Sequence, residues 1–256
     1  RVMTSPGGPA PFSSAGEGPN ASTGVLLSHG FTGSTVSMLG WARYLADAGY
    51  AVSLPLLPGH GTTWQELART PWQHWYQAYE DAYTELAGRT DRVFAAGLSM
   101  GGALALRLAA RQPVAGVAVV NPGLTVADAR ARYAHLLKYV MPSVPAIGNS
   151  IRMPGQDEGA YPRTPVGAVA QLLRLFKDTA GHLPDVTVPV IAFRSTVDPV
   201  VPESSMDLIR RLLGSAELEV VPLTNSYHVA TMDHDAQLIF DRSHEFIQRV
   251  SAGAAA

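Results

Sequence analysis

Five consecutive residues, Gly97-Leu98-Ser99-Met100-Gly101, could carry nucleophilic chemistry. They follow a short apolar run at 92–96 and begin a segment that is rich in Ala and Leu. A sharp turn from a strand into a helix exposes a serine oxygen, and glycines on both sides remove the crowding that side chains would cause there. The helix would also stabilise negative charge through its N-terminal dipole. The motif alone is a weak signal in a chain with 24 glycines, so the strand before it and the helix after it make Ser99 the candidate nucleophile.

A serine hydroxyl is a poor nucleophile, so a histidine must take its proton and an acid must hold that histidine in the right tautomer. Where such a turn carries the nucleophile, the acid and then the histidine follow it along the chain. Asp198 comes directly after the apolar run at 190–193, at the end from which parallel strands present side chains. Asp185 precedes that run, and Glu203 and Asp207 fall in the next predicted helix, so Asp198 is the predicted acid.

The predicted base is His228, which follows the last apolar run at 219–222. His182 lies in a predicted insertion, and His234 and His244 begin or lie on the closing helix, where a solvated surface role is the ordinary interpretation. The position of His228 after a strand is the one that lets its ring meet a carboxylate on one side and a serine on the other.

The acyl-transfer chemistry also needs backbone N–H groups for the oxyanion, one after the nucleophile and one from the first strand–helix loop. Met100 meets the first requirement, and Phe31 in the loop His29-Gly30-Phe31-Thr32-Gly33 meets the second. For His29 itself, we prefer a buried side chain bonded to a neighbouring loop over any role as base.

The composition excludes several other functions. The formal net charge is −2 with no basic run, which argues against a nucleic-acid partner. Without Cys there is no thiol catalysis or thiolate metal site, and the eight His form no His-Glu-x-x-His pair. No glycine-rich loop ends in Lys-Ser or Lys-Thr, so we expect neither a metal nor another cofactor.

Short apolar segments alternate with helical periodicity, which is typical of a mainly parallel sheet with helices on both faces. We expect strands at 25–28, 51–54, 92–96, 116–120, 190–193 and 219–222. Helices are predicted at 100–111 and 235–250, and a further one runs to 86 with Thr70 as N-cap, Pro71 at its first position and Gln73 completing a capping box.

The rhythm of strands and helices breaks for nearly seventy residues after 120, far more than an ordinary connection. We predict a cap insertion at 121–184 within a core formed by 23–120 and 185–252, preceded by a surface arm at 1–22. The insertion is rich in apolar residues, and most of them would pack it onto the core while the remainder could line an acyl-chain pocket. No apolar run reaches the roughly 20 residues of a membrane span, so we expect a soluble protein. A cytoplasmic location is favoured, with secretion after loss of a signal peptide as the alternative.

These segments together resemble the bacterial monoacylglycerol lipases and small carboxylesterases of the α/β-hydrolase superfamily. The resemblance rests on the segments at 29–34, 57–62, 97–102 and 225–231. It implies an α/β-hydrolase fold with an inserted cap, Ser99, Asp198 and His228 as a catalytic triad, and the amides of Phe31 and Met100 as an oxyanion hole.

The resemblance also implies two roles within the cap. Asp157-Glu158-Gly159-Ala160-Tyr161 looks like the family segment whose Glu binds the glycerol head group, which would give Glu158 that role. Ile147 similarly matches a residue that narrows the substrate channel. The extra Arg and Pro residues at 152–163 depart from the family pattern, and a solvated loop carboxylate is the competing interpretation of Glu158.

The leading functional hypothesis is therefore hydrolysis of monoacylglycerols to glycerol and fatty acid through an acyl-enzyme on Ser99. A general carboxylesterase for short acyl chains would use the same residues with a smaller pocket. A catalytically silent ligand-binding protein of this fold is the hypothesis from another class, and the complete set of serine, acid and histidine argues against it. The expected partner is a small lipid ester, with transient contact to lipid surfaces through the cap; the oligomeric state is open.

Overall fold

The computed structural model describes residues 9–146 and 148–253. Within them, a seven-stranded sheet has the order β1-β3-β2-β4-β5-β8-β9. Six of its strands run parallel and correspond to the six predicted ones, some of them one to two residues longer at an end: β2 (Thr23–Ser28), β3 (Ala51–Leu54), β4 (Arg92–Leu98), β5 (Gly116–Val120), β8 (Val190–Ser195) and β9 (Leu218–Leu223). The prediction of a mainly parallel sheet is confirmed.

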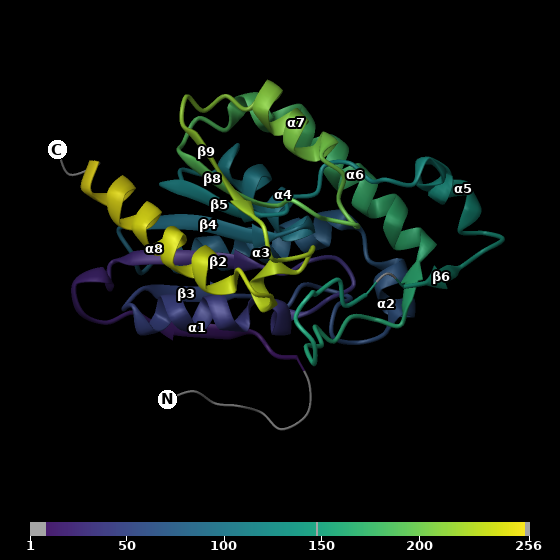
Figure 1. The fold of residues 1–256 in the computed structure, drawn as a ribbon, viewed down its shortest axis with the longest axis horizontal. Coiled ribbons are helices and arrows are strands. Elements are labelled where there is room, and N and C mark those ends of the chain that lie inside the picture. The colour runs from purple at the N-terminus through teal and green to yellow at the C-terminus, as the bar shows by residue number, and fades with distance from the viewer. Residues whose placement is uncertain (1–8, 147, 254–256) are drawn as a thin grey trace.

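Both faces of this sheet are apolar, because successive side chains of each strand enter two different cores. Along β2, Leu26 packs with α3 (Trp72–Ala87) and α4 (Met100–Ala109), whereas Val25 and Leu27 pack with α1 (Leu39–Asp47) and α8 (Ala236–Gly253). Figure 1 shows α1 and α8 beside the sheet, with α6 (Val166–His182) and α7 (Ser204–Leu212) on its other side. Coverage on both faces explains why the strands are apolar throughout and do not alternate.

The first residues of the described chain correct one prediction. Phe12–Ala15 lie in the segment interpreted as a surface arm, yet they form strand β1, which pairs antiparallel with β3 at the edge of the sheet. Four residues, of which every second one is exposed, carry too little periodicity to be distinguished from a coil.

The N-terminus of α3, the helix that ends at Ala87, also differs from its prediction. Pro71 is its N-cap, and no side chain caps it. The Thr70 hydroxyl instead donates to the Glu66 carbonyl, 2.9 Å away, at the end of α2 (Trp64–Arg69). The predicted capping box with Gln73 is therefore wrong, because Thr70 is the C-cap residue of α2, its side chain is turned back toward that helix, and Pro71 takes the N-cap position of α3.

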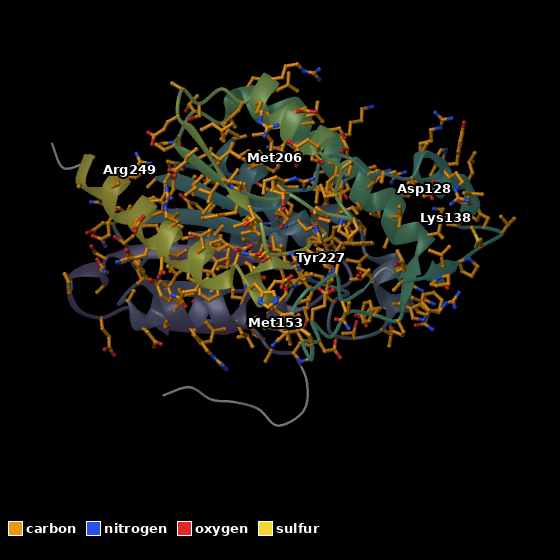
Figure 2. The ribbon with its side chains drawn as sticks, viewed as in Figure 1. Asp128, Lys138, Met153, Met206, Tyr227 and Arg249 are labelled. Carbon is orange, nitrogen blue, oxygen red and sulfur yellow. The ribbon has the colours of Figure 1, made fainter. Side chains whose placement is uncertain are left out.

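The segment between β5 and β8, called the inserted segment below (residues 121–189), has two parts. Its outer part contains α5 (Ala134–Leu137) and a hairpin of β6 (Ser143–Pro145) and β7 (Arg163–Pro165). This part lies at the end of the molecule away from the C-terminus of α8, as the labels α5 and β6 in Figure 1 and Asp128 and Lys138 in Figure 2 show. The other part of the inserted segment is α6, which packs along α4. Asp178 of α6 pairs with the buried Arg107 of α4.

Short 3-10 helices complete the described chain, at Gly18–Asn20, Thr35–Met38, Ala129–Tyr133, Leu183–Asp185 and Ala230–Met232. None of the helices in residues 9–146 and 148–253 combines the length and apolarity needed to cross a membrane.

Candidate active site

Ser99 occupies the turn between β4 and α4 in a strained conformation, with φ +56° and ψ −115°. Its backbone N–H donates to the Val120 carbonyl at 2.9 Å. A Cβ on Gly97 would lie 2.2 Å from the Gly101 carbonyl carbon, and a Cβ on Gly101 would lie 2.2 Å from the Ser28 carbonyl oxygen. Both glycines are therefore required for α4 to start so close to β2 and β4. A serine held at positive φ is the kind of local strain that folds retain at functional sites.

Asp198 and His228 meet at the carboxyl ends of β8 and β9. The His228 Nδ1–H donates to Asp198 Oδ2 at 2.9 Å, and the Asp198 side chain is fully buried. The other carboxylate oxygen accepts the backbone N–H groups of Val200 and Val201 at 2.9 and 3.0 Å. Burial would by itself raise the pKa of Asp198, but the His228 bond and these two amides favour the ionised form and bring its pKa below the usual value.

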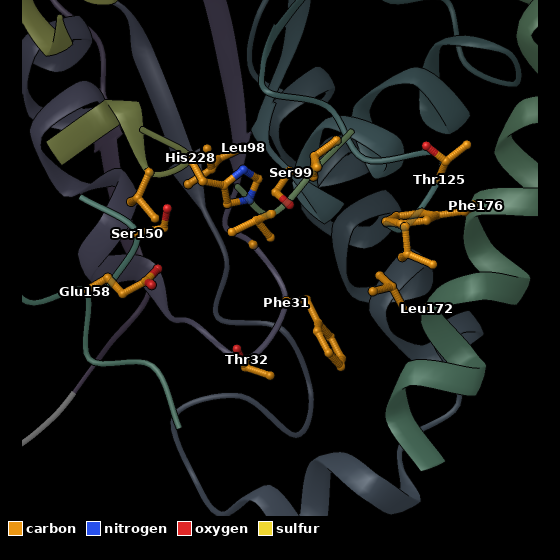
Figure 3. A pocket seen from close by; sticks show the side chains of 15 residues that line it. Phe31, Thr32, Leu98, Ser99, Thr125, Ser150, Glu158, Leu172, Phe176 and His228 are labelled. Atoms are coloured by element: carbon orange, nitrogen blue, oxygen red, sulfur yellow. The ribbon is translucent and has the colours of Figure 1, made fainter. Parts of the chain in front are cut away.

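Ser99 and the His228 ring face one another across a pocket (Figure 3). Because Asp198 holds Nδ1, the ring's Nε2 is the nitrogen left to act on a second group. No hydrogen bond joins the Ser99 hydroxyl to this ring among the residues that the structure describes. Catalytic hydrogen bonds often tighten only when substrate is bound, so the arrangement is compatible with proton transfer between the two side chains.

The two predicted oxyanion donors, the amides of Phe31 and Met100, lie beside Ser99 at the ends of β2 and β4. Neither N–H donates to another group within residues 9–146 and 148–253, and Phe31 lines the pocket. Two amides without a protein acceptor on either side of a serine could stabilise an alkoxide that forms there.

The loop that carries Phe31 is fixed by His29, which is fully buried. Its Nδ1–H donates to the Gly30 carbonyl at 2.9 Å, and its Nε2 accepts the Leu57 N–H at 3.1 Å. Burial lowers the pKa of His29 to about 4, only partly opposed by the bond to Gly30. The prediction of a buried histidine bonded to a neighbouring loop is confirmed.

The pocket has a polar side and an apolar side, with Ser99 between them (Figure 3). Glu158 and Ser150 lie on the polar side, near His228. Leu172 and Phe176 of α6 lie on the opposite side. An amphipathic molecule could therefore place its polar part against Glu158 and its apolar part against α6, with the bond between them at Ser99.

Glu158 is held in place by a reciprocal pair of bonds with Asn149. The Asn149 N–H donates to Glu158 Oε1 at 2.9 Å, and the Glu158 N–H donates to Asn149 Oδ1 at 3.0 Å. Burial raises the pKa of Glu158, although the Asn149 amide and the nearby His228 lower it in part. A fixed carboxylate in the pocket differs from the freely solvated loop carboxylate that was the competing interpretation. Ile147, the other predicted cap residue, lies outside the described residues.

Comparisons with known proteins agree with this geometry. A family model described as serine aminopeptidase, S33, matches residues 19–235. The chain belongs to this family. It is a serine hydrolase of the α/β-hydrolase superfamily, as the sequence predicted. It is 39% identical over 234 residues to a thermostable monoacylglycerol lipase of Bacillus sp. (strain H-257), covering 90% of this chain and 92% of the relative. A carboxylesterase of Bacillus subtilis (strain 168) is 25% identical over 243 residues, covering 94% and 97%.

Solved structures show the same fold. One reported with LipS and LipT, two metagenome-derived lipolytic enzymes, superposes with a TM-score of 0.89 at 39% identity, covering 94% of this chain and 97% of that one. A monoacylglycerol lipase of Paleococcus ferrophilus superposes with a TM-score of 0.74 at 19% identity, with the same coverage, and this likeness concerns the fold alone.

The residues that competed for the acid and base roles in this serine hydrolase lie elsewhere. Asp207 is in α7 and pairs with Arg210, and Glu203 is the N-cap residue of that helix. Asp185 ends the 3-10 helix that precedes β8. The rings of His182 and His244 bond to the Asp178 carbonyl and the Tyr50 hydroxyl, and none of these groups, nor His234, is among the described residues that line the pocket.

Sequence reasoning missed two residues of this serine hydrolase that support the site. Asn121 is fully buried at φ +43° just after β5, and its amide bonds to both Ser195 and the backbone of His228. Arg194 lies in β8 and donates to Asp198. The available signal was the same for both, namely a polar side chain at the carboxyl end of an apolar strand. Within the described chain, no group of three His, Asp or Glu side chains could hold a metal ion.

Proposed function

We propose that this serine hydrolase cleaves carboxylic esters, and monoacylglycerols in particular, with Ser99, Asp198 and His228 as its catalytic triad. The observation that carries the proposal is the convergence of separate groups on one pocket: a serine on a strained turn, a histidine ring bonded to a buried carboxylate, and two unpaired amides. The similarity to a lipase and a carboxylesterase supports an ester as the substrate.

In the proposed acylation step, His228 Nε2 takes the Ser99 proton as the serine oxygen attacks the ester carbonyl. Asp198 keeps Nδ1 protonated and stabilises the imidazolium that forms. The Phe31 and Met100 amides bind the oxyanion, and the start of α4 adds its dipole. When the tetrahedral intermediate collapses, the imidazolium gives its proton to the departing alkoxide, which leaves as glycerol. A water molecule activated by His228 then releases the fatty acid and restores Ser99.

The two sides of the pocket fit the two parts of a monoacylglycerol. The glycerol hydroxyls would lie against Glu158, whose carboxylate oxygens accept hydrogen bonds, and the acyl chain would lie against Leu172 and Phe176. A short-chain ester would use the same serine but gain little from Glu158. The comparison of these two substrate classes therefore tests the assignment.

The deciding experiment is a turnover panel of monoacylglycerols, diacylglycerols, simple esters and an amino-acid anilide over several chain lengths. We expect kcat/KM to be highest for monoacylglycerols. A preference for short simple esters would make the enzyme a general carboxylesterase, and a preference for the anilide would make it a peptidase. Ser99→Ala should lower kcat by at least about three orders of magnitude and leave the circular dichroism spectrum unchanged. An active Ser99→Ala variant would refute the nucleophile.

The role of Glu158 has its own test. Glu158→Ala should raise KM for monoacylglycerols more than for p-nitrophenyl esters, because only the former carry the hydroxyls. Glu158→Gln is the matched control, since an amide keeps an acceptor oxygen and much of the side-chain volume. Equal changes for both substrates would remove Glu158 from head-group recognition.

We further propose that residues 121–184 act as a cap that touches lipid surfaces. Five of the seven large apolar side chains exposed in the described chain lie within nine residues, Tyr133–Met141. Among them, Tyr139 and Val140 are 79% and 81% exposed. Arg132 and Lys138 stack on neighbouring tyrosines, which adds positive charge to the same surface. This combination suits an anionic lipid interface.

Sedimentation with vesicles tests the contact. The enzyme should bind vesicles that contain anionic lipid, and Tyr139→Ser with Val140→Ser should weaken that binding without changing hydrolysis of a dissolved short-chain ester. Unchanged vesicle binding by the double variant would refute this surface.

A further inference from the structure

We propose that Arg194 is a positioning residue that limits how strongly Asp198 stabilises protonated His228, and so extends the activity of this enzyme toward lower pH. The inference rests on the proposed triad. One atom, Asp198 Oδ2, accepts both the His228 Nδ1–H at 2.9 Å and the Arg194 Nη1–H at 3.0 Å. The acid therefore shares a single oxygen between the catalytic base and a permanent cation.

Arg194 is fixed in this position by all parts of its guanidinium group. Besides Nη1, its Nε donates to Glu203 Oε2 at 3.0 Å and its Nη2 donates to the Val201 carbonyl at 2.8 Å. The side chain is 9% exposed. A planar fork with three partners cannot swing away from Asp198 without also removing a donor from the buried Val201 carbonyl.

This geometry has an electrostatic consequence for His228. Each nitrogen lies about 3 Å from the same oxygen, so the guanidinium and the imidazole Nδ1 are at most about 6 Å apart. When His228 gains a proton, the new positive charge is attracted by Asp198 and repelled by Arg194. Without Arg194, Asp198 would act on the ring as an uncompensated buried carboxylate and would keep it protonated to higher pH.

The benefit of Arg194 is then an enzyme that remains active at lower pH. A protonated His228 cannot take the Ser99 proton, so the acidic limb of the pH–rate profile follows its deprotonation. Arg194 moves the midpoint of that limb to lower pH. Arg194 also helps to hold the carboxylate in position, because the Val200 and Val201 amides bind Oδ1 while the side chains of Arg194 and His228 bind Oδ2.

Other charged groups also lie near this pair. From α7, Glu203 partly neutralises Arg194 but is half exposed and shared with Arg210. From the inserted segment, Glu158 interacts with His228 across the pocket, with Asp157 beside it. On the His228 loop itself, Asp233 is occupied by four backbone N–H groups, including that of Tyr227. Arg152, also from the inserted segment, is an exposed cation that stacks on Tyr227 next to His228. The anions favour protonated His228, and Arg194 is a buried cation that opposes them through its bond to Asp198.

The test is the pH dependence of kcat/KM for a soluble p-nitrophenyl ester in Arg194→Met, Arg194→Lys and the wild type. The midpoint of the acidic limb should move to higher pH by about 0.5–2 pH units in Arg194→Met. The range reflects weak or strong solvent screening of two charges about 6 Å apart. Arg194→Lys keeps the charge, so its midpoint should move less. Arg107→Met is the matched control, because Arg107 is an equally buried ion-paired arginine, remote from the pocket, and it should not move the limb.

A purely structural role for Arg194 would lower activity at every pH and leave the midpoint in place, within about 0.2 units, and that result would overturn the proposal. A downward shift would also overturn it. If Arg194→Met does not fold, Glu203→Gln provides the test, because removal of the counterion strengthens Arg194 and should move the limb to lower pH; an upward move would contradict the proposal.

Failure of the triad itself would look different. The His228 ring can be titrated by NMR in Ser99→Ala and in Ser99→Ala with Arg194→Met, which needs no turnover. If Arg194→Met moves the midpoint of this titration to higher pH while His228→Gln keeps full activity, the coupling between Arg194, Asp198 and His228 is supported. The catalytic assignment of His228 is then rejected. The absence of any shift in the titration would reject the coupling.

Discussion

Asn121 lies outside the predicted site, and its removal should disturb that site strongly. Its Nδ2–H groups donate to Ser195 Oγ at 2.9 Å and to the His228 carbonyl at 2.8 Å, and its Oδ1 accepts the Ser195 N–H at 2.8 Å. The side chain thus ties the end of β5 to the end of β8 and to the histidine loop. Asn121→Gly removes these bonds but still allows the backbone its φ of +43°.

The expected cost follows from the groups left behind. The Ser195 N–H and the His228 carbonyl would lose their buried partner, and each unsatisfied buried group costs about 1–3 kcal/mol. Asn121→Gly should therefore lower the free energy of unfolding by about 2–6 kcal/mol, a large part of the 5–15 kcal/mol that typical domains possess. Asn121→Ala loses the same bonds and adds about 1–2 kcal/mol, because alanine is strained in the left-handed region.

Urea denaturation at low temperature measures these differences, and Asn149→Gly is the matched control. Asn149 also has positive φ, at +53°, but is exposed, so water can replace its bonds and we expect a loss below about 1 kcal/mol. In the folded fraction of Asn121→Gly, displacement of His228 should lower kcat/KM by about 10- to 100-fold, as small misplacements of reacting groups do. If Asn121→Gly costs no more than Asn149→Gly, the bridging role is refuted.

Two further predictions concern the loops that frame the site. Burial lowers the pKa of His29 to about 4 and that of His60 to about 3, from 6.5, so the unfolded chain binds more protons than the folded one below pH 6.5. The free energy of unfolding should fall as pH drops from 6.5 toward 4, by up to about 1.4 kcal/mol per pH unit for each histidine, and His60→Gln should halve the slope; a flat profile in the wild type would contradict this. The Tyr161 hydroxyl donates to the Gly59 carbonyl at 2.8 Å and accepts the Thr62 N–H at 2.9 Å. Tyr161→Phe should cost about 1–2 kcal/mol in urea denaturation, and a loss below about 0.3 kcal/mol would show that this bridge does not stabilise the fold.

The sequence indicated most of the sheet because its strands are buried on both faces and therefore apolar throughout. It also indicated the turn at Ser99, where the steric demand on Gly97 and Gly101 is local and leaves a mark in the residues themselves. Strand β1 escaped because its pairing with β3 depends on contacts between segments far apart in the chain. The Thr70 cap was wrong for a different, local reason, since its hydroxyl donates to the Glu66 carbonyl in the preceding helix.

The supporting residues of the site could not be derived in the same way. Asn121 and Arg194 each follow or end an apolar run, which marks them as polar groups at the carboxyl edge of a sheet. Their partners, however, come from other strands, and no spacing in the sequence says that Arg194 shares an oxygen with His228. Glu158 depended on resemblance to a family, because a loop carboxylate has no periodicity that would reveal its fixed place in the pocket.

The strand order explains why the candidate site forms where it does. From β2 the chain leaves toward α1 on one face and returns to β3, whereas from β4 it leaves toward α4 on the opposite face. Because β2 and β4 are neighbours, the loops after them diverge and open a crevice at the carboxyl edge, as expected at a topological switch point. Phe31 and Met100 follow these two strands and lie on the two sides of this crevice, as the proposed oxyanion hole requires. The loops after β5, β8 and β9 bring Asn121, Asp198 and His228 to the same edge, where the His228 ring lines the pocket together with Ser99.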